Sequence, residues 1–396
     1  MRPWCLLLLL LVAHIEYACA EDVEPNRLQK IIPKQLFVPE LPRLDIEPSV
    51  PGLLKFEYAS NGYIEVGHAT LVIPSEKQSR SSMLALARQL TVRGFALRPS
   101  LSEIDLTLYA QGSGTIQGYG ASMPLLTASV PRNKLSAFVK FTQNRGTYGR
   151  VWEASQAAYM DWRIEERIPS KPAPFVRSTP MVDNIARRLS GLNFNLFYRG
   201  VSRKQVALTF DDAPHPLYLP LLLDLLKRVN VKATFFCIGR NAEAYPYFVK
   251  DMVVQGHELG NHTYNHIRLP GLSQMEVQNE LEQTSQVLER LTHENVRFFR
   301  PPGGRYNAQT LAVARSLGLI TVFWTSDSGD FMKRDESDAL HRMQKISGGG
   351  IVLLHDNSWT TIQGLSGFIE SARIKGLTVG TVGELMDGGE HETIGY

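Results

Sequence analysis

From Val206 onward, short apolar segments alternate with helical ones, and this alternation restricts the possible folds more than any other feature of the chain. Helical crossovers between strands produce a parallel sheet, which either closes into a barrel or stays open and doubly wound. Seven segments have the length and composition of strands: Val206–Phe210, Ala233–Ile238, Glu258–Gly260, Phe298–Arg300, Ile320–Trp324, Ile351–His355 and Leu377–Val379.

Polar side chains recur at the carboxyl ends of five of these strands. In βα-barrels the catalytic side chains come from the carboxyl ends of several different strands. The pattern therefore favours a barrel over an open sheet. The residues at these ends are Asp211 and Asp212, His262 and His266, Arg300, Asp327 and Asp330, and His355.

Asp211 and Asp212 are adjacent acids at the end of an apolar strand, and they repel each other unless a positive charge lies beside them. His262 and His266 are four residues apart, so on a helical turn they share one face. With one carboxylate they form a two-histidine, one-carboxylate metal site. Arg300 would hold the second aspartate ionised.

Each of these motifs has an ordinary alternative when it stands alone. A histidine pair can be a surface feature, an Asp-Asp pair a solvated turn, and Arg-Pro-Pro a rigid bend. Their joint occurrence at strand ends favours the functional interpretation. Five further histidines lack such neighbours and are interpreted as structural or exposed: His215, His257, His293, His341 and His391.

Length and composition indicate a globular protein with two domains. The chain has 396 residues, of which 43% are hydrophobic and 20% charged, so it can form a sizeable core. The net charge of +3 is small, and the chain has no basic arm or stripe, so we expect no nucleic-acid partner.

Residues 1–20 have the features of a secretory signal peptide. Arg2 precedes a short apolar run, and Ala18 and Ala20 provide small residues before a cleavage site at Glu21. The run is too short to remain as a membrane anchor, so we expect no transmembrane segment in the mature chain. The exported chain would keep one cysteine, Cys237, as a small buried hydrophobe without a disulfide.

The rest of the chain divides by composition. We expect a small α+β domain over residues 21–166, beginning with an extended Pro-rich lead to residue 51 that runs over the surface. Its predicted elements are a hairpin at residues 55–73, helices at 82–92 and 134–141, and strands at 103–108 and 125–130, the first of these half-buried. Residues 167–200 would form a Pro-rich linker and a connecting helix at 182–192, residues 201–388 the catalytic domain, and residues 389–396 a tail.

Residues 201–385 resemble the polysaccharide deacetylases of carbohydrate esterase family 4, which share the NodB homology domain. The stretches TFDDAP, HTYNH, RPPGG, DSGDF and LLH match the five motifs of that family in order. The resemblance implies a distorted barrel of about seven parallel strands with helices. It also implies a divalent metal, usually Zn²⁺.

The resemblance implies a role for each matching residue. Asp212, His262 and His266 would bind the metal, and Asp211 would be the general base. Arg300 would orient Asp211. His355 would be the general acid with Asp330 supporting it, and Gly303, Phe331 and Leu353 would form the pocket, Gly303 through its backbone N–H. Asp327 is less tied to the chemistry and is expected to be structural.

Three positions depart from the family pattern. Ala213 stands where the family usually has glycine, and Gly303 where many members carry an aromatic residue. Phe331 stands where a tryptophan is usual, which keeps an apolar wall but removes the indole N–H. The departure at Phe331 leaves the pocket size and the substrate preference open.

The resemblance implies a hydrolase that removes N-acetyl groups from N-acetylglucosamine-containing polysaccharide or oligosaccharide, such as peptidoglycan, a chitin-like polymer or an exopolysaccharide. The signal peptide predicts that this hydrolase is exported to the periplasm, the cell surface or the extracellular space. The alternatives are an O-acetyl esterase or a non-sugar amidase with the same metal site. A glycan-binding pseudoenzyme is disfavoured because no ligand, base or acid is missing. A non-haem iron oxygenase is disfavoured because its usual fold is a β-rich jelly roll. The oligomeric state and the role of the N-terminal domain stay open.

Overall fold

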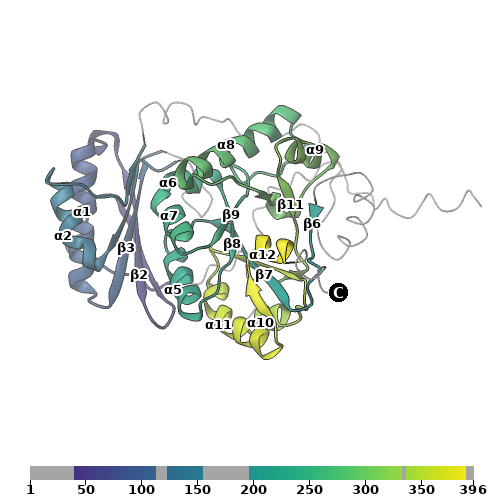
Figure 1. The fold of residues 1–396 in the computed structure, drawn as a ribbon. Coiled ribbons are helices and arrows are strands. Elements are labelled where there is room, and N and C mark those ends of the chain that lie inside the picture. Colours follow the sequence, from purple (N-terminus) through teal and green to yellow (C-terminus); the bar gives the residue numbers. More distant parts are fainter. Residues whose placement is uncertain (1–39, 113–122, 155–195, 332–335, 389–396) are drawn as a thin grey trace, which may run out of the picture. The chain divides into compact units, whose positions relative to one another are not determined.

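The computed structural model describes residues 40–112, 123–154, 196–331 and 336–388 (Figure 1), and these belong to one compact unit, Phe37–Tyr396. Several predictions lie outside the described residues. These are the signal peptide at 1–20, most of the linker and the whole connecting helix within 167–200, and the tail at 389–396. The domain boundaries stay predictions.

The larger sheet consists entirely of parallel strands, in the order β12-β13-β7-β8-β9-β10-β11-β6, with β14 pairing with β7. No pairing joins β12 to β6 among the described residues, so the barrel is open there. The strands are β6 Leu196–Phe197, β7 Gln205–Ala213, β8 Thr234–Cys237, β9 Glu258–Asn261, β10 Phe298–Phe299, β11 Ile320–Val322, β12 Ser326–Asp327, β13 Ile351–His355 and β14 Thr378–Gly380. The predicted distorted α/β barrel is confirmed, and two short strands, β6 and β12, were not foreseen.

Helices connect these strands and surround them (Figure 1). They are α5 Leu219–Val229, α6 Gly239–Ala244, α7 Pro246–Val254, α8 Gln274–Thr292, η3 Pro302–Gly304, α9 Ala308–Ser316, α10 Glu336–Met343, α11 Trp359–Ile374 and α12 Val382–Asp387. Helix α8 begins with a capping box between Ser273 and Glu276. Helix α5 buries its leucine stripe completely at Leu222 and Leu226, and this burial anchors the helix on the sheet.

The smaller region is an α+β layer, as predicted. Its sheet has the order β1-β2-β3-β4-β5, with β1 and β2 antiparallel around Asn61-Gly62 and β2 parallel to β3. Helices α1 and α2 pack on one face of this sheet (Figure 1). The elements are β1 Leu53–Ser60, β2 Glu65–Ile73, η1 Ser75–Lys77, α1 Arg80–Leu97, β3 Leu101–Ala110, β4 Leu126–Pro131, η2 Arg132–Lys134, α2 Leu135–Thr142 and β5 Val151–Glu153.

Strand β3 is buried on both faces, so the prediction that it is half-buried is wrong. Asp105 and Thr107, on the face predicted to be polar and exposed, are almost completely buried. Helices α6 and α7 of the larger region cover this face. The Thr107 hydroxyl lies 3.0 Å from the Tyr245 hydroxyl, and the Thr127 hydroxyl donates to the Ala244 carbonyl. Strand alternation predicts which side chains share a face, but not whether a second layer covers that face.

The Pro-rich lead runs over the surface where it is described, as predicted, because most of residues 40–51 are exposed. Leu41, Ile46 and Val50 are buried, with at most 8% of their surface exposed. Leu41 packs in the core of the barrel, and Ile46 and Val50 pack in the core of the smaller sheet. These three side chains therefore anchor a stretch whose other residues lie at the surface.

Candidate active site

The end of β7 brings two adjacent acids to one place. Neighbouring residues on a regular strand point to opposite faces, but the pairing of β7 with β8 has a bulge between Phe210 and Ala213. Asp212 has φ of 74°, in the left-handed region, a conformation that costs a non-glycine residue about 1–3 kcal/mol. As a result, both carboxylates face His262 Nε2, Asp211 Oδ2 at 3.7 Å and Asp212 Oδ1 at 3.6 Å.

The two histidines follow β9 on a loop, so the prediction that they share a helical turn is wrong. Thr263 and His266 both have positive φ angles, 64° and 56°, which breaks any helical turn. The loop nevertheless places the rings of His262 and His266 with their centroids 5.1 Å apart. The pair therefore meets through an irregular backbone that sequence spacing does not reveal.

Asp212, His262 and His266 form a group whose ligand atoms all lie within 4.8 Å of one another. His262 Nδ1 lies 2.8 Å from the Arg300 carbonyl oxygen, which can only accept, so the lone pair is on Nε2. Burial lowers the pKa of His262 to about 4, so the ring is neutral at neutral pH. Neutral imidazole and carboxylate ligands suit Zn²⁺, so these residues fit the predicted metal.

The charge of Asp212 is favoured by its surroundings. Burial opposes ionisation, but the nearby His266, His355 and His262 lower the pKa of the Asp212 carboxyl below its usual range. His266 Nε2 lies 3.1 Å from Asp212 Oδ1. An ionised Asp212 is the form that a cation can use as a ligand.

Arg300 connects the two acids to the histidine loop. Its side chain is completely buried, and Nη1 donates to Asp211 Oδ1 at 2.7 Å and to the Thr209 hydroxyl at 2.8 Å. Burial lowers the pKa of Arg300 and Asp211 raises it. Because the Arg300 carbonyl also holds His262, one residue sets the orientation of a candidate base and of a candidate ligand.

His355 and Asp330 form a second charged pair. His355 Nδ1 lies 2.9 Å from Asp330 Oδ1, and the His355 backbone N–H donates to Asp330 Oδ2 at 2.8 Å. Thr361 also donates to Asp330. Burial lowers the pKa of His355, but Asp330, Asp212 and Asp211 together raise it to about 10. The imidazole is therefore protonated at neutral pH, the state that a general acid requires.

The three predicted pocket residues differ in their exposure to solvent: Phe331 and Gly303 are exposed, and Leu353 is buried. The Phe331 ring packs edge-on against His355 at a centroid distance of 4.9 Å and is 37% exposed. Leu353 lies on β13 and is buried. Gly303 lies in η3 with φ of 60° and is exposed. Asp327 accepts a hydrogen bond from the Gly329 N–H at 2.9 Å, a structural contact that holds its own loop.

Several polar residues that contact the site had no place in the sequence prediction. The Asn357 side chain donates to Asp212 Oδ2 at 3.2 Å, and the Asn241 side chain donates to the Asp212 carbonyl. Asn357 comes two residues after His355, so its nearness to a motif was the available signal. Asn241 has no such signal, because it reaches the site from helix α6.

Other predictions about single residues can be checked directly. Cys237 is completely buried and free, as expected. His215 Nδ1 accepts from the backbone N–H groups of Leu217 and Tyr218, and His293 ends helix α8. Among the described residues, no helix has the length and apolar composition needed to cross a membrane.

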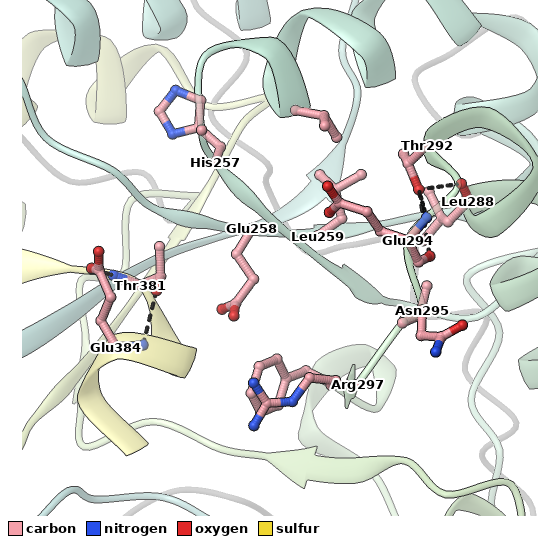
Figure 2. A pocket seen from close by; sticks show the side chains of 14 residues that line it. His257, Glu258, Leu259, Leu288, Thr292, Glu294, Asn295, Arg297, Thr381 and Glu384 are labelled. Carbon is pink, nitrogen blue, oxygen red and sulfur yellow. Dashed lines mark hydrogen bonds between the residues drawn. The ribbon is translucent and has the colours of Figure 1, made fainter. Parts of the chain in front are cut away.

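A cavity of about 370 Å³ lies away from this site (Figure 2). It borders Glu258 and Phe298 at the amino ends of β9 and β10, whereas His262 and Arg300 follow the carboxyl ends of these strands. Glu258 accepts from the Thr234 hydroxyl at 2.6 Å and the Gly383 N–H at 3.1 Å. These contacts support the barrel, and the chemistry-bearing side chains lie at the other end of the strands.

The fold and the strand-end residues define a hydrolase of the α/β-barrel class, and comparison with known proteins identifies the family. The family model for polysaccharide deacetylase matches residues 199–322. A peptidoglycan-N-acetylglucosamine deacetylase of Bacillus cereus is 36% identical over 191 residues, which cover 47% of this chain and 89% of that protein. The chain therefore belongs to the polysaccharide deacetylase family, and the relatives named as peptidoglycan-N-acetylglucosamine deacetylases hydrolyse amide bonds.

Two further proteins are similar to this chain. The peptidoglycan-N-acetylglucosamine deacetylase PgdA of Listeria monocytogenes is 32% identical over 235 residues, 58% of this chain and 49% of that protein, so the chain spans about half of that relative. The solved Bc1960 peptidoglycan N-acetylglucosamine deacetylase is 31% identical, covers 50% of this chain and 96% of its own, and superimposes with a TM-score of 0.48.

Proposed function

We propose that this protein is an exported, metal-dependent deacetylase that removes N-acetyl groups from N-acetylglucosamine residues of a polysaccharide, with peptidoglycan as the first candidate. One observation carries the proposal. The possible metal ligands, the candidate base Asp211 and the candidate acid His355 meet at the same strand ends, where Asp211 and His355 are register partners on β7 and β13. The names of the bacterial relatives support peptidoglycan as the substrate.

Asp212, His262 and His266 would hold the cation, which we take to be Zn²⁺. When bound, such an ion supplies Lewis acidity, which polarises the acetyl carbonyl and lowers the pKa of the attacking water. The three residues would supply one carboxylate oxygen and two imidazole nitrogens, which is the number of protein ligands in catalytic zinc sites.

Asp211 would act as the general base. Arg300 holds its Oδ1, and its Oδ2 faces His262 Nε2, so the carboxylate lies next to the candidate ligands. Asp211 takes a proton from the water while the water oxygen adds to the acetyl carbon. The Gly303 N–H would donate to the carbonyl oxygen as negative charge develops there.

His355 would act as the general acid. It gives its proton to the departing sugar nitrogen, the C–N bond breaks, and acetate and a free amine remain. Asp330 keeps the imidazole protonated and fixes Nδ1 as a donor, so the proton that moves is on Nε2. Phe331, packed against His355, and Leu353 would form the apolar wall for the acetyl methyl group.

The test is acetate release from N-acetylglucosamine oligomers and from purified peptidoglycan, with added Zn²⁺ and with a chelator. We expect acetate that appears with metal, disappears with chelator, and is accompanied by one free amine per acetate. Release only from acetate esters, or from non-sugar amides, would contradict the proposed substrate class. Acetate release that persists in the chelator would contradict metal dependence.

The export part of the proposal rests on residues 1–20, with the charged start, apolar run and small residues described above. Expression of the full chain in a bacterial host, followed by N-terminal sequencing of the protein outside the cytoplasm, tests it. We expect the mature protein to begin at Glu21. A chain that stays in the cytoplasm with Met1 intact would contradict export.

A further inference from the structure

Asp212 presents its two carboxylate oxygens to different partners. Oδ1 lies 3.1 Å from His266 Nε2 and 3.6 Å from His262 Nε2, on the side of the candidate metal site. Oδ2 accepts a hydrogen bond from the Asn357 side-chain amide at 3.2 Å. The carboxylate is therefore held so that one oxygen faces the histidines and the other faces an amide.

The turn that contains Asn357 is hydrogen-bonded to residues before and after Asp212. Both hydrogen bonds are made by Asp356, the residue that precedes Asn357. The Asp356 N–H donates to the Asp211 carbonyl at 3.0 Å, and the His215 N–H donates to Asp356 Oδ2 at 2.6 Å. Asp356 is completely buried. Since these two contacts join the turn after β13 to the turn after β7, Asn357 needs little reorganisation to reach Asp212.

Asp212 also needs support of this kind. Its φ of 74° lies in the left-handed region, so the backbone alone does not favour the conformation that aims its carboxylate. Asn241 holds its carbonyl, and Asn357 holds its carboxylate. An amide is a neutral donor, so it orients the carboxylate without neutralising the charge that a cation requires.

We infer that Asn357 is a positioning residue for the metal site, which occupies Asp212 Oδ2 and thereby presents Oδ1 as a single-oxygen ligand. This inference rests on the metal site in the proposed function. It adds a residue outside the five sequence motifs, and it joins the candidate ligand on β7 to the strand that carries the candidate acid His355.

The experiment measures the Zn²⁺ dissociation constant of the full chain by competition with a chromophoric chelator, for the wild type and for Asn357→Leu. Leucine has nearly the same size and cannot donate. We expect Asn357→Leu to weaken Zn²⁺ binding about 10- to 100-fold, the range for loss of a partner that orients a ligand. The unfolding temperature of the zinc-free protein should stay unchanged, which separates positioning from a structural role.

Two further variants keep the test decisive. Asn357→Ser is small and polar but too short to reach Asp212 Oδ2, so it should show the same loss even if leucine disturbs folding. Asn295→Leu is the matched control, because exposed Asn295 borders the cavity at the amino ends of the strands (Figure 2). It should bind Zn²⁺ like the wild type.

The outcomes separate this inference from the proposed function. Zn²⁺ affinity within about twofold of the wild type in both Asn357 variants overturns the inference, since the usual loss is about 10-fold or more. A wild type that binds no Zn²⁺ overturns the metal site and the inference together. A wild type that binds Zn²⁺ but releases no acetate overturns the deacetylase proposal, while the dissociation constants still decide the role of Asn357.

Discussion

The strand-end cluster and a second buried cluster, on β3, both place acids around an arginine, and they satisfy their charges differently. The strand-end cluster contains Asp211, Asp212, His262, His266 and Arg300. The β3 cluster contains Glu103, Asp105, Arg150 and Asp251. In the β3 cluster, Arg150 contacts Glu103 Oε1 at 3.1 Å and Asp251 Oδ2 at 2.7 Å, but neither oxygen of Asp105 has a hydrogen-bond partner among the described residues.

Three acids share one guanidinium in the β3 cluster, so positive charge is in short supply. Burial, and next the charge of Glu103, raise the pKa of Asp105 well above its usual range, and burial raises the pKa of Glu103 as well. Burial and the neighbouring charge therefore favour the protonated form of these acids on β3. In the strand-end cluster, we propose that a metal cation supplies the missing positive charge, because histidines face Asp212 there and keep it ionised.

The largest expected difference between the two clusters is in catalytic activity, which we expect to depend on the strand-end cluster and not on the β3 cluster. Asp211→Asn removes the candidate base but leaves the three candidate ligands. We expect kcat/KM for acetate release to fall about 10²- to 10⁴-fold, the usual contribution of general base catalysis, with Zn²⁺ still bound. Asp251→Asn, the matched change in the β3 cluster, should leave kcat/KM unchanged. An Asp211→Asn variant with wild-type turnover would refute the assignment of the base.

Arg300→Met tests the stability of the strand-end cluster. The Arg300 side chain is completely buried, and its removal leaves Asp211 buried without its cation. Breaking a buried pair in this way costs about 3–5 kcal/mol, so the free energy of unfolding should fall by that amount. Urea unfolding of the zinc-free protein measures it. An unpaired buried charge usually costs several kcal/mol. A loss of unfolding free energy under about 1 kcal/mol would therefore contradict this prediction, because it would show that Asp211 is not left as an unpaired charge.

Arg150→Met is the corresponding change on β3, and we expect a smaller effect. Arg150 and Asp251 keep 20% and 33% of their side-chain surface exposed, so water can solvate Asp251 after the change. Loss of charged hydrogen bonds of this kind costs about 1.5–3 kcal/mol. The same urea experiment checks it, and acetate release should be unaffected. Equal losses for Arg150→Met and Arg300→Met would remove the contrast between the two clusters.

Asp105→Asn tests the β3 cluster through the pH dependence of the free energy of unfolding. Burial, and next the charge of Glu103, raise the pKa of Asp105 in the folded protein, so folding takes up a proton at pH values between the unfolded and the folded pKa. The associated stability is complete below the unfolded pKa of about 3.9 and is lost as the pH rises toward the folded pKa. The wild type should therefore lose up to about 1.4 kcal/mol of unfolding free energy per pH unit above pH 4 through this group.

The Asp105→Asn variant cannot take up that proton, so its unfolding free energy should depend less on pH and exceed the wild-type value at pH 7. Urea unfolding at a series of pH values from 5 to 8 measures both slopes. Glu103, whose pKa is also raised, stays in both proteins, so the difference between the slopes reports Asp105 together with its coupling to Glu103. Identical slopes would mean that Asp105 is ionised in the folded protein.

Much of the candidate site followed from local sequence patterns. Strand-length apolar segments joined by helical ones specify a parallel sheet, and the carboxyl ends of parallel strands lie at one edge. This rule brings Asp211, His262, Arg300 and His355 together although up to 144 residues separate them along the chain. The distances in the structure agree with that expectation for the ion pairs of Asp211 with Arg300 and of Asp330 with His355.

The sequence by itself determined the larger fold and the residues at its strand ends. Hydrophobic periodicity and the succession of strand and helix segments along the chain can both be read from local sequence. The tertiary structure decided what depends on two segments meeting. The irregular loop that joins His262 to His266, the cover over Asp105 on β3, and the reach of Asn357 to Asp212 each require a second backbone at a particular distance. Local patterns contain no information about that distance, so only the folded chain reveals these contacts.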